Sequence, residues 1–320
     1  MTNRRDFLKA AAFSLASSKL GASANTNLRT MQGIFPIMQT PYADSGRLDT
    51  EVLAKEVKFL DKIGVHGVVW PQLASEWTTI EPDERLAGAE AVMAAAKGGR
   101  CAVVLGVQGP DAEAARRYAR QAEKLGPDAI IALPPSDIGN LDNVADYYKA
   151  IAKECGLPLF VQTVGNMSIE FVLRMRKDIP TLRFVKDEAG HTLSRISEYR
   201  RVAPDLVVFT GGHGKTMADE LARGASGTMP AAPFADLYVQ LWNYWQAGKH
   251  EKAMEDLSRI SLLVNQVSAY GLPSLKYMLY LRGVFPNWRC RGKADDPHFD
   301  AEAQRSVKET YEFAHKLLKS

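Results

Sequence analysis

The sequence Leu182-Arg183-Phe184-Val185-Lys186-Asp187-Glu188-Ala189-Gly190 ends a short apolar run in one lysine, which acidic residues and a glycine follow at once. Such a run is typical of a strand buried in a parallel sheet. Burial disfavours the ammonium form of a lysine, so a buried amine becomes free to attack a ketone and form a Schiff base. A lysine that ends a strand can equally lie at the surface, with its stem packed on apolar neighbours. The choice between these two interpretations depends on the fold that the rest of the chain predicts.

Apolar runs of this kind recur along the chain and alternate with segments of helical periodicity. The predicted strands are 33–40, 66–71, 101–107, 129–133, 159–163, 183–186, 206–210 and 227–230. The predicted helices are 50–63, 82–97, 111–125, 143–155, 168–177, 194–202 and 215–223. Eight such units in roughly 200 residues predict an α/β fold of the (β/α)8 TIM-barrel type. A doubly wound open sheet is the alternative, but no G-x-G-x-x-G motif follows the first strand.

The chain beyond the eighth predicted strand forms a C-terminal extension. From about residue 234 the sequence predicts additional helices, with breaks at 271–273 and 285–297 where glycine and proline cluster. Because no linker or low-complexity stretch interrupts the chain, residues 25–320 are expected to form a single domain.

The first 24 residues have the pattern of an export signal. Arg4 and Arg5 form a twin-arginine pair, a weakly apolar stretch follows, and Ala22-Ser23-Ala24 matches a cleavage site of small residues. We therefore expect export by the twin-arginine route and a periplasmic location. A short amphipathic N-terminal helix is the alternative interpretation.

The net positive charge of the chain comes from this predicted signal. The full sequence carries a formal net charge of +3, and residues 1–24 contain Arg4, Arg5, Lys9 and Lys19 against Asp6. The remainder is about neutral, so no nucleic-acid or membrane-lipid partner is expected. No later stretch approaches the roughly 18 apolar residues of a membrane span.

Metal and disulfide chemistry have no sequence signature here. Cys101, Cys155 and Cys290 lie far apart without C-x-x-C spacing, and their count is odd. No H-x-H, H-E-x-x-H or D-x-D motif ends a predicted strand. Neither a metal nor another cofactor is expected.

Active sites of such barrels lie at the C-terminal ends of the strands. The residues at those ends are Thr40, 71–76, Gln108, Pro134, Pro135, Gln162, Thr163, Lys186, Gly211, Gly212, His213, Met229 and Pro230. Lys186 is the only lysine among them, which favours Schiff-base chemistry over a surface role.

Residues 31–318 also resemble a known family, that of dihydrodipicolinate synthase and N-acetylneuraminate lyase. The resemblance lies in Thr40-Pro41-Tyr42, Glu76 with Pro82-Asp83-Glu84-Arg85, Pro134-Pro135, Val185-Lys186-Asp187 and Gly224-Ala225-Ser226-Gly227. It implies a (β/α)8 barrel with a C-terminal helical extension, assembled as a homotetramer or homodimer. It also implies a class I lyase in which the lysine of the sixth strand, here Lys186, forms an imine with pyruvate or another 2-oxo acid. The imine then acts as an electron sink.

Two motifs depart from the family pattern. The family's G-T-T-G-E, whose hydroxyls and amides hold the substrate carboxylate, is Gln72-Leu73-Ala74-Ser75-Glu76 here. The family's Y-N-x-P begins with a proton-relaying tyrosine, and here it reads Gln162-Thr163-Val164-Gly165. Glutamine donates and accepts hydrogen bonds but does not titrate near neutral pH, so another group must carry the proton.

The candidate site residues follow from these positions. Lys186, Gln162 and His213 are the predicted catalytic set, with His213 as a proton shuttle or a ligand for a sugar-acid hydroxyl. Asp187 and Glu188 are candidates to tune the lysine electrostatically, but Asp187 should point away from the barrel interior, because adjacent residues of a strand face opposite sides. The predicted substrate-binding residues are Thr40, Gln72, Ser75, Glu76, Gly211 and Met229.

Three hypotheses stay open from the sequence. The first is a Schiff-base lyase, aldolase or dehydratase, that acts on a 2-oxo acid, for example one derived from a sugar. The second is a non-catalytic barrel that binds small molecules and has lost the tyrosine and the threonine pair. The third is a barrel enzyme whose chemistry does not use an imine. Cleavage, dehydration and condensation are all compatible with the first.

Overall fold

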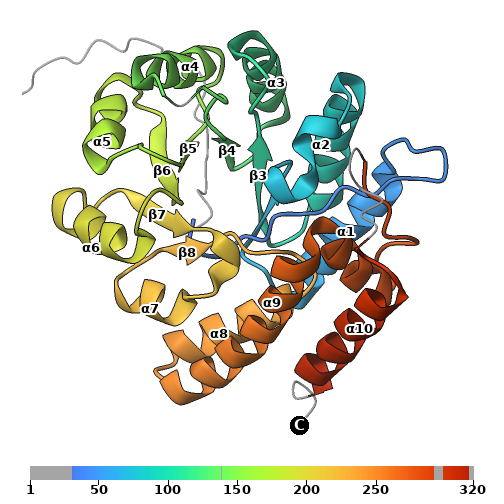
Figure 1. The fold of residues 1–320 in the computed structure, drawn as a ribbon. Helices are drawn as coiled ribbons and strands as arrows, with labels where there is room; N and C mark the ends of the chain where they lie inside the picture. The colour runs from blue at the N-terminus through green and yellow to red at the C-terminus, as the bar shows by residue number, and fades with distance from the viewer. Residues whose placement is uncertain (1–30, 138, 292–297, 317–320) are drawn as a thin grey trace, which may run out of the picture.

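A computed structural model describes residues 31–137, 139–291 and 298–316; the predicted export signal lies outside them. The described residues form one eight-stranded parallel sheet with the order β1-β8-β7-β6-β5-β4-β3-β2. Helices surround the strands, and the predicted TIM barrel is confirmed (Figure 1). The strands are β1 (Gly33–Ile34), β2 (Gly67–Trp70), β3 (Ala102–Gly106), β4 (Ala129–Ala132), β5 (Leu159–Thr163), β6 (Leu182–Asp187), β7 (Val207–Thr210) and β8 (Gly227–Thr228).

The first and second strands close the barrel through irregular pairing. Ile37 forms a parallel bridge with Val69, and the Met38 N–H donates to the Val69 carbonyl over 3.0 Å. β1 is much shorter than the predicted strand 33–40 because Pro36 has no N–H to donate to a ladder. β8 is shortened in the same way before Pro230.

The helices between the strands begin and end at residues that cap them. They are α1 (Thr50–Ile63), α2 (Pro82–Ala96), α3 (Ala112–Leu125), α4 (Leu141–Glu154), α5 (Ile169–Asp178), α6 (Thr192–Val202) and α7 (Met217–Ala222). For example, the Asp49 side chain accepts a hydrogen bond from the Val52 N–H, and Gly64 ends α1 in the left-handed conformation. Aspartate at the N-cap and glycine in the left-handed conformation at the C-terminal end are common ways of capping a helix.

Aromatic rings fill the middle of the barrel. Phe35, Phe160, Phe184 and Phe209 belong to the interior core, and the rings of Phe160 and Phe184 stack with centroids 4.5 Å apart. Phe209 contacts Phe160 and Phe35 edge-on, at 5.4 and 5.0 Å. Because strand side chains alternate between faces, the next inward residues after Phe160 and Phe184 are Gln162 and Lys186. The rings therefore form an apolar floor directly below the predicted catalytic lysine.

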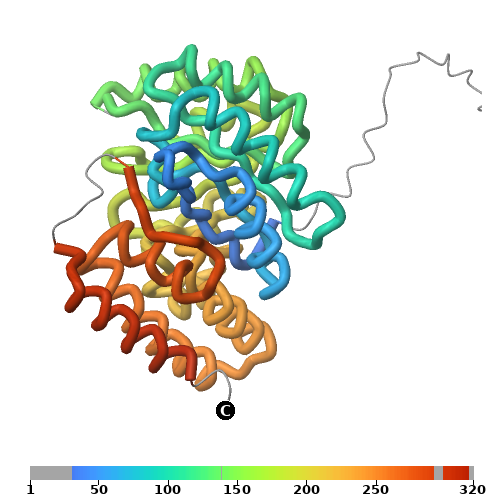
Figure 2. The backbone as a smooth tube through the Cα atoms, turned by 90° about the vertical axis from the view of Figure 1, so that its right-hand side faces the viewer, coloured from blue at the N-terminus to red at the C-terminus, as the bar shows by residue number. Residues whose placement is uncertain are grey.

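Three helices follow the barrel: α8 (Ala235–Gln246), α9 (His250–Leu281) and α10 (Ala301–Lys316). The expected break at 271–273 is a kink inside α9, where Gly271 has φ 62° and ψ −147° and Pro273 lacks an N–H. Beyond α9, the segment 284–291 lies beside residues 42–47 of the first βα loop (Figure 2). Among the helices of the described residues, none has the length and apolarity needed to cross a membrane.

Candidate active site

Lys186 lies at the C-terminal end of β6 and faces the barrel interior. Its side chain is only 6% exposed, and strand pairing places it next to Gln162 of β5. Phe184, two residues earlier on the same face, lies below it in the apolar floor. The enclosed lysine that the sequence predicts is therefore present.

Glu188 is the partner of this lysine. Its Oε2 lies 3.0 Å from Lys186 Nζ and accepts a hydrogen bond from the Gln162 side-chain amide. Its Oε1 accepts from the Gly212 N–H over 2.9 Å. The Glu188 side chain is 26% exposed, so the ion pair lies at the boundary between the barrel interior and the mouth.

The charge of Lys186 determines the ionisation of this carboxyl group. Burial acts to raise the pKa of Glu188, but the ammonium of Lys186 and the N–H donors of Gly212 and Gln162 outweigh it. The pKa of Glu188 is therefore held below its ordinary value. In the resting site, lysine and glutamate form a charged pair.

Gly211 gives the Glu188 carboxylate its room. A Cβ built on Gly211 would lie 1.9 Å from Glu188 Oε1 and 2.4 Å from Cδ, so the carboxylate packs directly on the glycine backbone. Gly211, a predicted site residue, therefore contacts Glu188, which in turn pairs with Lys186.

His213 follows in a short 3-10 turn, Gly212–Gly214, with φ 58°. Its pKa is lowered by burial and by the charge of Lys186, while Glu188 acts in the opposite direction. Both charges thus act on the imidazole, which lies at the same end of the barrel. A lowered pKa keeps it neutral at physiological pH.

Asp187 points out of the barrel, as strand alternation predicts. Its carboxylate accepts two 2.8 Å hydrogen bonds from Arg195 of α6 and one of 2.7 Å from Thr163. These bonds join β5, β6 and α6 behind the site. The role of Asp187 is to fix the end of β6 from which Lys186 and Glu188 project.

In the loop after β2, where the family threonines are absent, the hydroxyl groups form hydrogen bonds with neighbouring residues of the protein. Ser75 Oγ donates to the Met38 carbonyl and accepts from the Gln72 N–H over 3.0 Å. Thr40 Oγ1 donates to the Ser75 carbonyl and accepts from the Trp70 indole over 3.1 Å. Both hydroxyls therefore shape the short 3-10 turn Leu73–Ser75.

Gln72 is oriented by another amide. Its Nε2 donates to Gln108 Oε1 over 3.0 Å, while Gln108 Nε2 donates to the Pro71 carbonyl over 2.8 Å. The buried Oε1 of Gln72 has no hydrogen-bond partner among the described residues, and the same holds for Oε1 of Gln162. Each amide oxygen is an acceptor available to a donor on a ligand.

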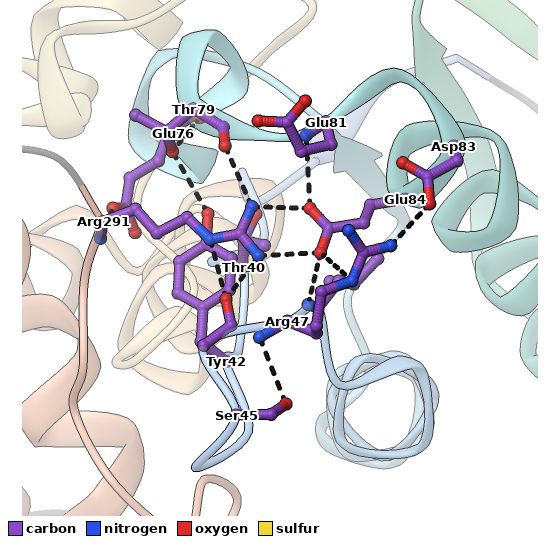
Figure 3. Close-up of polar contacts among 12 residues, drawn as sticks. Thr40, Tyr42, Ser45, Arg47, Glu76, Thr79, Glu81, Asp83, Glu84 and Arg291 are labelled. Atoms are coloured by element: carbon purple, nitrogen blue, oxygen red, sulfur yellow. Dashed lines mark hydrogen bonds and ion pairs between the residues drawn. The ribbon is translucent and has the colours of Figure 1, made fainter.

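Glu76 turns toward the C-terminal segment. It pairs with the fully buried Lys276 of α9, and its Oε2 accepts from the Arg291 N–H over 2.7 Å. Its backbone is left-handed, with φ 56°. Glu76 thus ties the loop after β2 to the segment after α9 (Figure 3).

Arg291 completes this connection. Its guanidinium binds the carboxylate of Glu84 with N–O distances of 2.5 and 2.7 Å and stacks over the Tyr42 ring at 4.2 Å (Figure 3). Although burial acts to raise it, the Arg291 guanidinium and the N–H groups of Leu48 and Glu81 together lower the pKa of Glu84 to about 2. Arg291 thus binds a carboxylate of the protein itself.

The candidate residues therefore fall into separate groups. Lys186, Gln162, Gly211 and His213 surround Glu188, whereas Thr40, Gln72, Ser75 and Glu76 belong to the rim formed by β1 and β2. Met229 packs with the interior aromatic core and is 2% exposed. Glu188 was not among the predicted site residues. The sequence signal that could have found Glu188 is its position two residues after Lys186. Because β6 stays extended through Asp187, the side chains of Lys186 and Glu188 lie on the same face.

A cleft of about 420 Å³ opens beside this group, between the loops after β6 and β7. The residues that line it include Glu188, Gly211, Gly212, His191 and Lys215. Within the described residues, no group of three His, Cys, Asp or Glu side chains could hold a metal ion.

Comparisons with known proteins find relatives along most of this chain. The model of the dihydrodipicolinate synthetase family matches residues 30–308. A relative, L-2-keto-3-deoxyarabonate dehydratase of Azospirillum brasilense, is 24% identical and covers 85% of this chain and 92% of its own length. The 4-hydroxy-tetrahydrodipicolinate synthase of Rhizobium meliloti is 29% identical over 70% of this chain and 78% of its own.

A solved structure supports the same architecture. A catalytic-lysine mutant of sialic acid aldolase from Ruminococcus gnavus superimposes with a TM-score of 0.84 and 22% identity. The match covers 92% of this chain and 98% of that one, so the likeness extends over the barrel and the C-terminal helices.

Proposed function

Because the chain belongs to the dihydrodipicolinate synthetase family, whose members include lyases, aldolases and dehydratases, we propose that it is a Schiff-base-forming lyase with Lys186 as nucleophile. The observation that carries the proposal is the position of Lys186, 6% exposed at the end of β6 above an apolar floor. A dry site protects an imine from water.

The substrate that we propose is a 2-oxo acid derived from a sugar. Two similar proteins carry names of this chemistry, a 2-keto-3-deoxyarabonate dehydratase and a sialic acid aldolase. The unpaired amide oxygens of Gln72 and Gln162 are acceptors that suit the hydroxyl groups of such a molecule. The hydroxyls of Thr40 and Ser75 are used within the loop after β2, so neither is offered to the carboxylate of the substrate.

We also propose that the enzyme works outside the cytoplasm as a homo-oligomer. The first proposal rests on the twin-arginine pattern of residues 1–24, and the second on the family. Fractionation of cells that express the full chain, compared with an Arg4→Lys, Arg5→Lys variant, tests the location. Light scattering after size-exclusion chromatography measures the mass of the assembly. The mass of a monomer would contradict the proposed homo-oligomer.

Borohydride trapping tests the chemistry. The protein is incubated with pyruvate, 2-oxobutyrate or 2-keto-3-deoxy-L-arabonate, reduced with borohydride, and examined by intact-mass and peptide mass spectrometry. We expect one covalent adduct at Lys186, none in Lys186→Ala, and an unchanged adduct in Lys177→Ala, which removes an exposed lysine of α5.

The competing hypothesis of a binding barrel makes a different prediction. In that case a 2-oxo acid would bind with saturation by calorimetry, yet no acid of the panel would label Lys186. That result would overturn the proposed lyase.

A further inference from the structure

Imine formation on Lys186 needs a group that accepts and returns protons, and Gln162 cannot be that group. An amide does not titrate near neutral pH. Gln162 instead donates its N–H to a carboxylate oxygen of Glu188. The residue in the tyrosine position therefore positions an acid instead of acting as one.

The Glu188 carboxylate lies within hydrogen-bond reach of the reacting nitrogen. Its Oε2 is 3.0 Å from Lys186 Nζ, inside the range that proton transfer requires. Among the described residues, Glu188 is the only acidic side chain paired with this lysine. The other carboxyls nearby are engaged elsewhere, Asp187 by Arg195 and Glu220 by two threonine hydroxyls.

The environment of Glu188 holds its carboxylate in one orientation. Oε1 is fixed by the Gly212 N–H, Oε2 is held by Gln162, and the carboxylate packs on Gly211, where a Cβ would clash. The 26% exposure of its side chain leaves access from the mouth. A ligand bound to Lys186 would thus meet this oxygen next to the newly formed carbon–nitrogen bond.

We propose that Glu188 is the acid–base catalyst of this site, carrying the proton that the family tyrosine would carry; the inference rests on the proposed Schiff-base function. In the resting pair, Lys186 is an ammonium and Glu188 a carboxylate. A proton passes from Nζ to Oε2 and leaves a neutral amine beside a carboxylic acid. The nitrogen lone pair then forms a bond to C2 of the 2-oxo acid, while the carbonyl π electrons move to oxygen.

That oxygen takes one proton from the nitrogen and becomes the hydroxyl of a carbinolamine. Glu188 gives its proton to the hydroxyl, the carbon–oxygen bond breaks, and water leaves as the nitrogen lone pair forms the C=N bond. The products are a protonated imine on Lys186, one water and the regenerated Glu188 carboxylate. Atoms and charge therefore balance without any further reactant.

The electrostatics of the pair fit this cycle. The main charge that lowers the pKa of Glu188 is the ammonium of Lys186, while burial acts to raise it. When Lys186 becomes a neutral amine or carbinolamine, that charge disappears and burial remains. Glu188 then holds a proton more readily, which is required in the steps between amine and imine.

The rate of imine formation tests the proposal. Wild type, Glu188→Gln and the control Glu198→Gln are mixed with pyruvate in a quenched-flow apparatus and reduced with borohydride at increasing times. Glu198 is a partly exposed glutamate of α6 that pairs with Arg201. If pyruvate does not label the wild type, 2-keto-3-deoxy-L-arabonate is used. Melting temperatures are measured in parallel.

We expect Glu188→Gln to form the adduct about 10²- to 10⁴-fold more slowly, the range of a lost acid–base catalyst. Its rate should also rise with pH, because Lys186 must now lose its proton to solvent. In Glu188→Ala, added formate should restore the rate in proportion to its concentration, and chloride should not. Rescue by a free carboxylate distinguishes proton transfer from a merely structural role.

Three results separate the failures. If no 2-oxo acid labels the wild type, the proposed function fails, and this inference fails with it. If the wild type is labelled and Glu188→Gln matches its rate and pH profile, only the inference fails. If Glu188→Gln is slow but formate restores nothing in Glu188→Ala, Glu188 is structural and the inference is again overturned.

Discussion

Lys186 and Glu188 leave strand β6 on the same face, two residues apart, and their charged atoms lie 3.0 Å from one another. Strand geometry produces this pairing, because side chains at i and i+2 share a face. The same geometry places Asp187 between them on the opposite face, bound to Arg195. Two neighbouring carboxylates thus have different environments and different tasks.

The Lys186–Glu188 pair should stabilise the fold as a unit. Lys186→Met leaves the Glu188 carboxylate without its cation, so we expect a loss of about 1–3 kcal/mol in the free energy of unfolding. Glu188→Gln in the Lys186→Met background should cost much less than it does in the wild type. A double-mutant cycle by urea denaturation measures the coupling. Purely additive effects would mean that the two residues do not interact in solution.

Gly211→Ala should displace Glu188. The new Cβ would overlap Glu188 Oε1, so the carboxylate must move away from Lys186. We expect slower imine formation together with a lower melting temperature. Gly156→Ala is the matched control, because a Cβ there has no neighbour closer than 3.9 Å. Equal trapping rates in Gly211→Ala and the wild type would contradict the position found for Glu188.

The protonation of His213 should report the charges of the pair. Burial and the Lys186 charge lower its pKa, while Glu188 raises it. The pKa of His213 should therefore fall further in Glu188→Gln and rise in Lys186→Met. Titration by nuclear magnetic resonance, with the signal assigned through His213→Gln, measures both shifts. An unchanged pKa in both variants would show that the imidazole does not sense these charges.

The same histidine affects stability in mild acid. Because its folded-state pKa is below its ordinary value of 6.5, the unfolded chain binds more protons in this window. The free energy of unfolding should therefore decrease as the pH falls through 6.5, and His213→Gln should reduce this dependence. Urea denaturation at pH 7.5 and 5.5 provides the comparison.

Glu84 should stabilise the protein through Arg291 in a pH-dependent way. Glu84→Gln weakens a carboxylate–guanidinium pair, and we expect a loss of about 1–3 kcal/mol at pH 7. The folded-state pKa of Glu84 is lowered to about 2, so its contribution is complete above an unfolded value of about 4.3 and is lost as the pH falls toward 2. The difference between wild type and variant should therefore shrink across that window.

Asp83→Asn is the control for this measurement. Asp83 pairs with Arg47 at the surface, where its side chain is 68% exposed, so the substitution should have a much smaller effect. An equal effect of both substitutions would mean that the Arg291 pair contributes no more than a surface contact.

Local sequence was enough to predict the barrel and its lysine. Strands such as Ala129–Ala132 are continuous apolar runs, and α1 lies between an aspartate cap and a glycine stop, so their boundaries follow from short-range chemistry. β1 was predicted too long because Pro36 ends a regular ladder while closure continues through Ile37 and Val69.

Contacts between distant segments could not be predicted in this way. Arg291 and Glu84 are 207 positions apart, and no local pattern links them. Glu188 was left out of the predicted site residues for a different reason. The strand was predicted to end at Lys186, whereas β6 runs through Asp187 and so aims the next residue into the site.

The rings of Phe35, Phe160, Phe184 and Phe209 seal the barrel beneath Lys186 and so affect the order of events in any cleavage reaction. A molecule joined to that lysine can reach solvent only through the opening by which it arrived. When one substrate breaks into two fragments, the free fragment must depart before the piece still attached to nitrogen can be hydrolysed and follow. The two fragments would then be released one after the other, and the last fragment would compete with incoming substrate for the same opening.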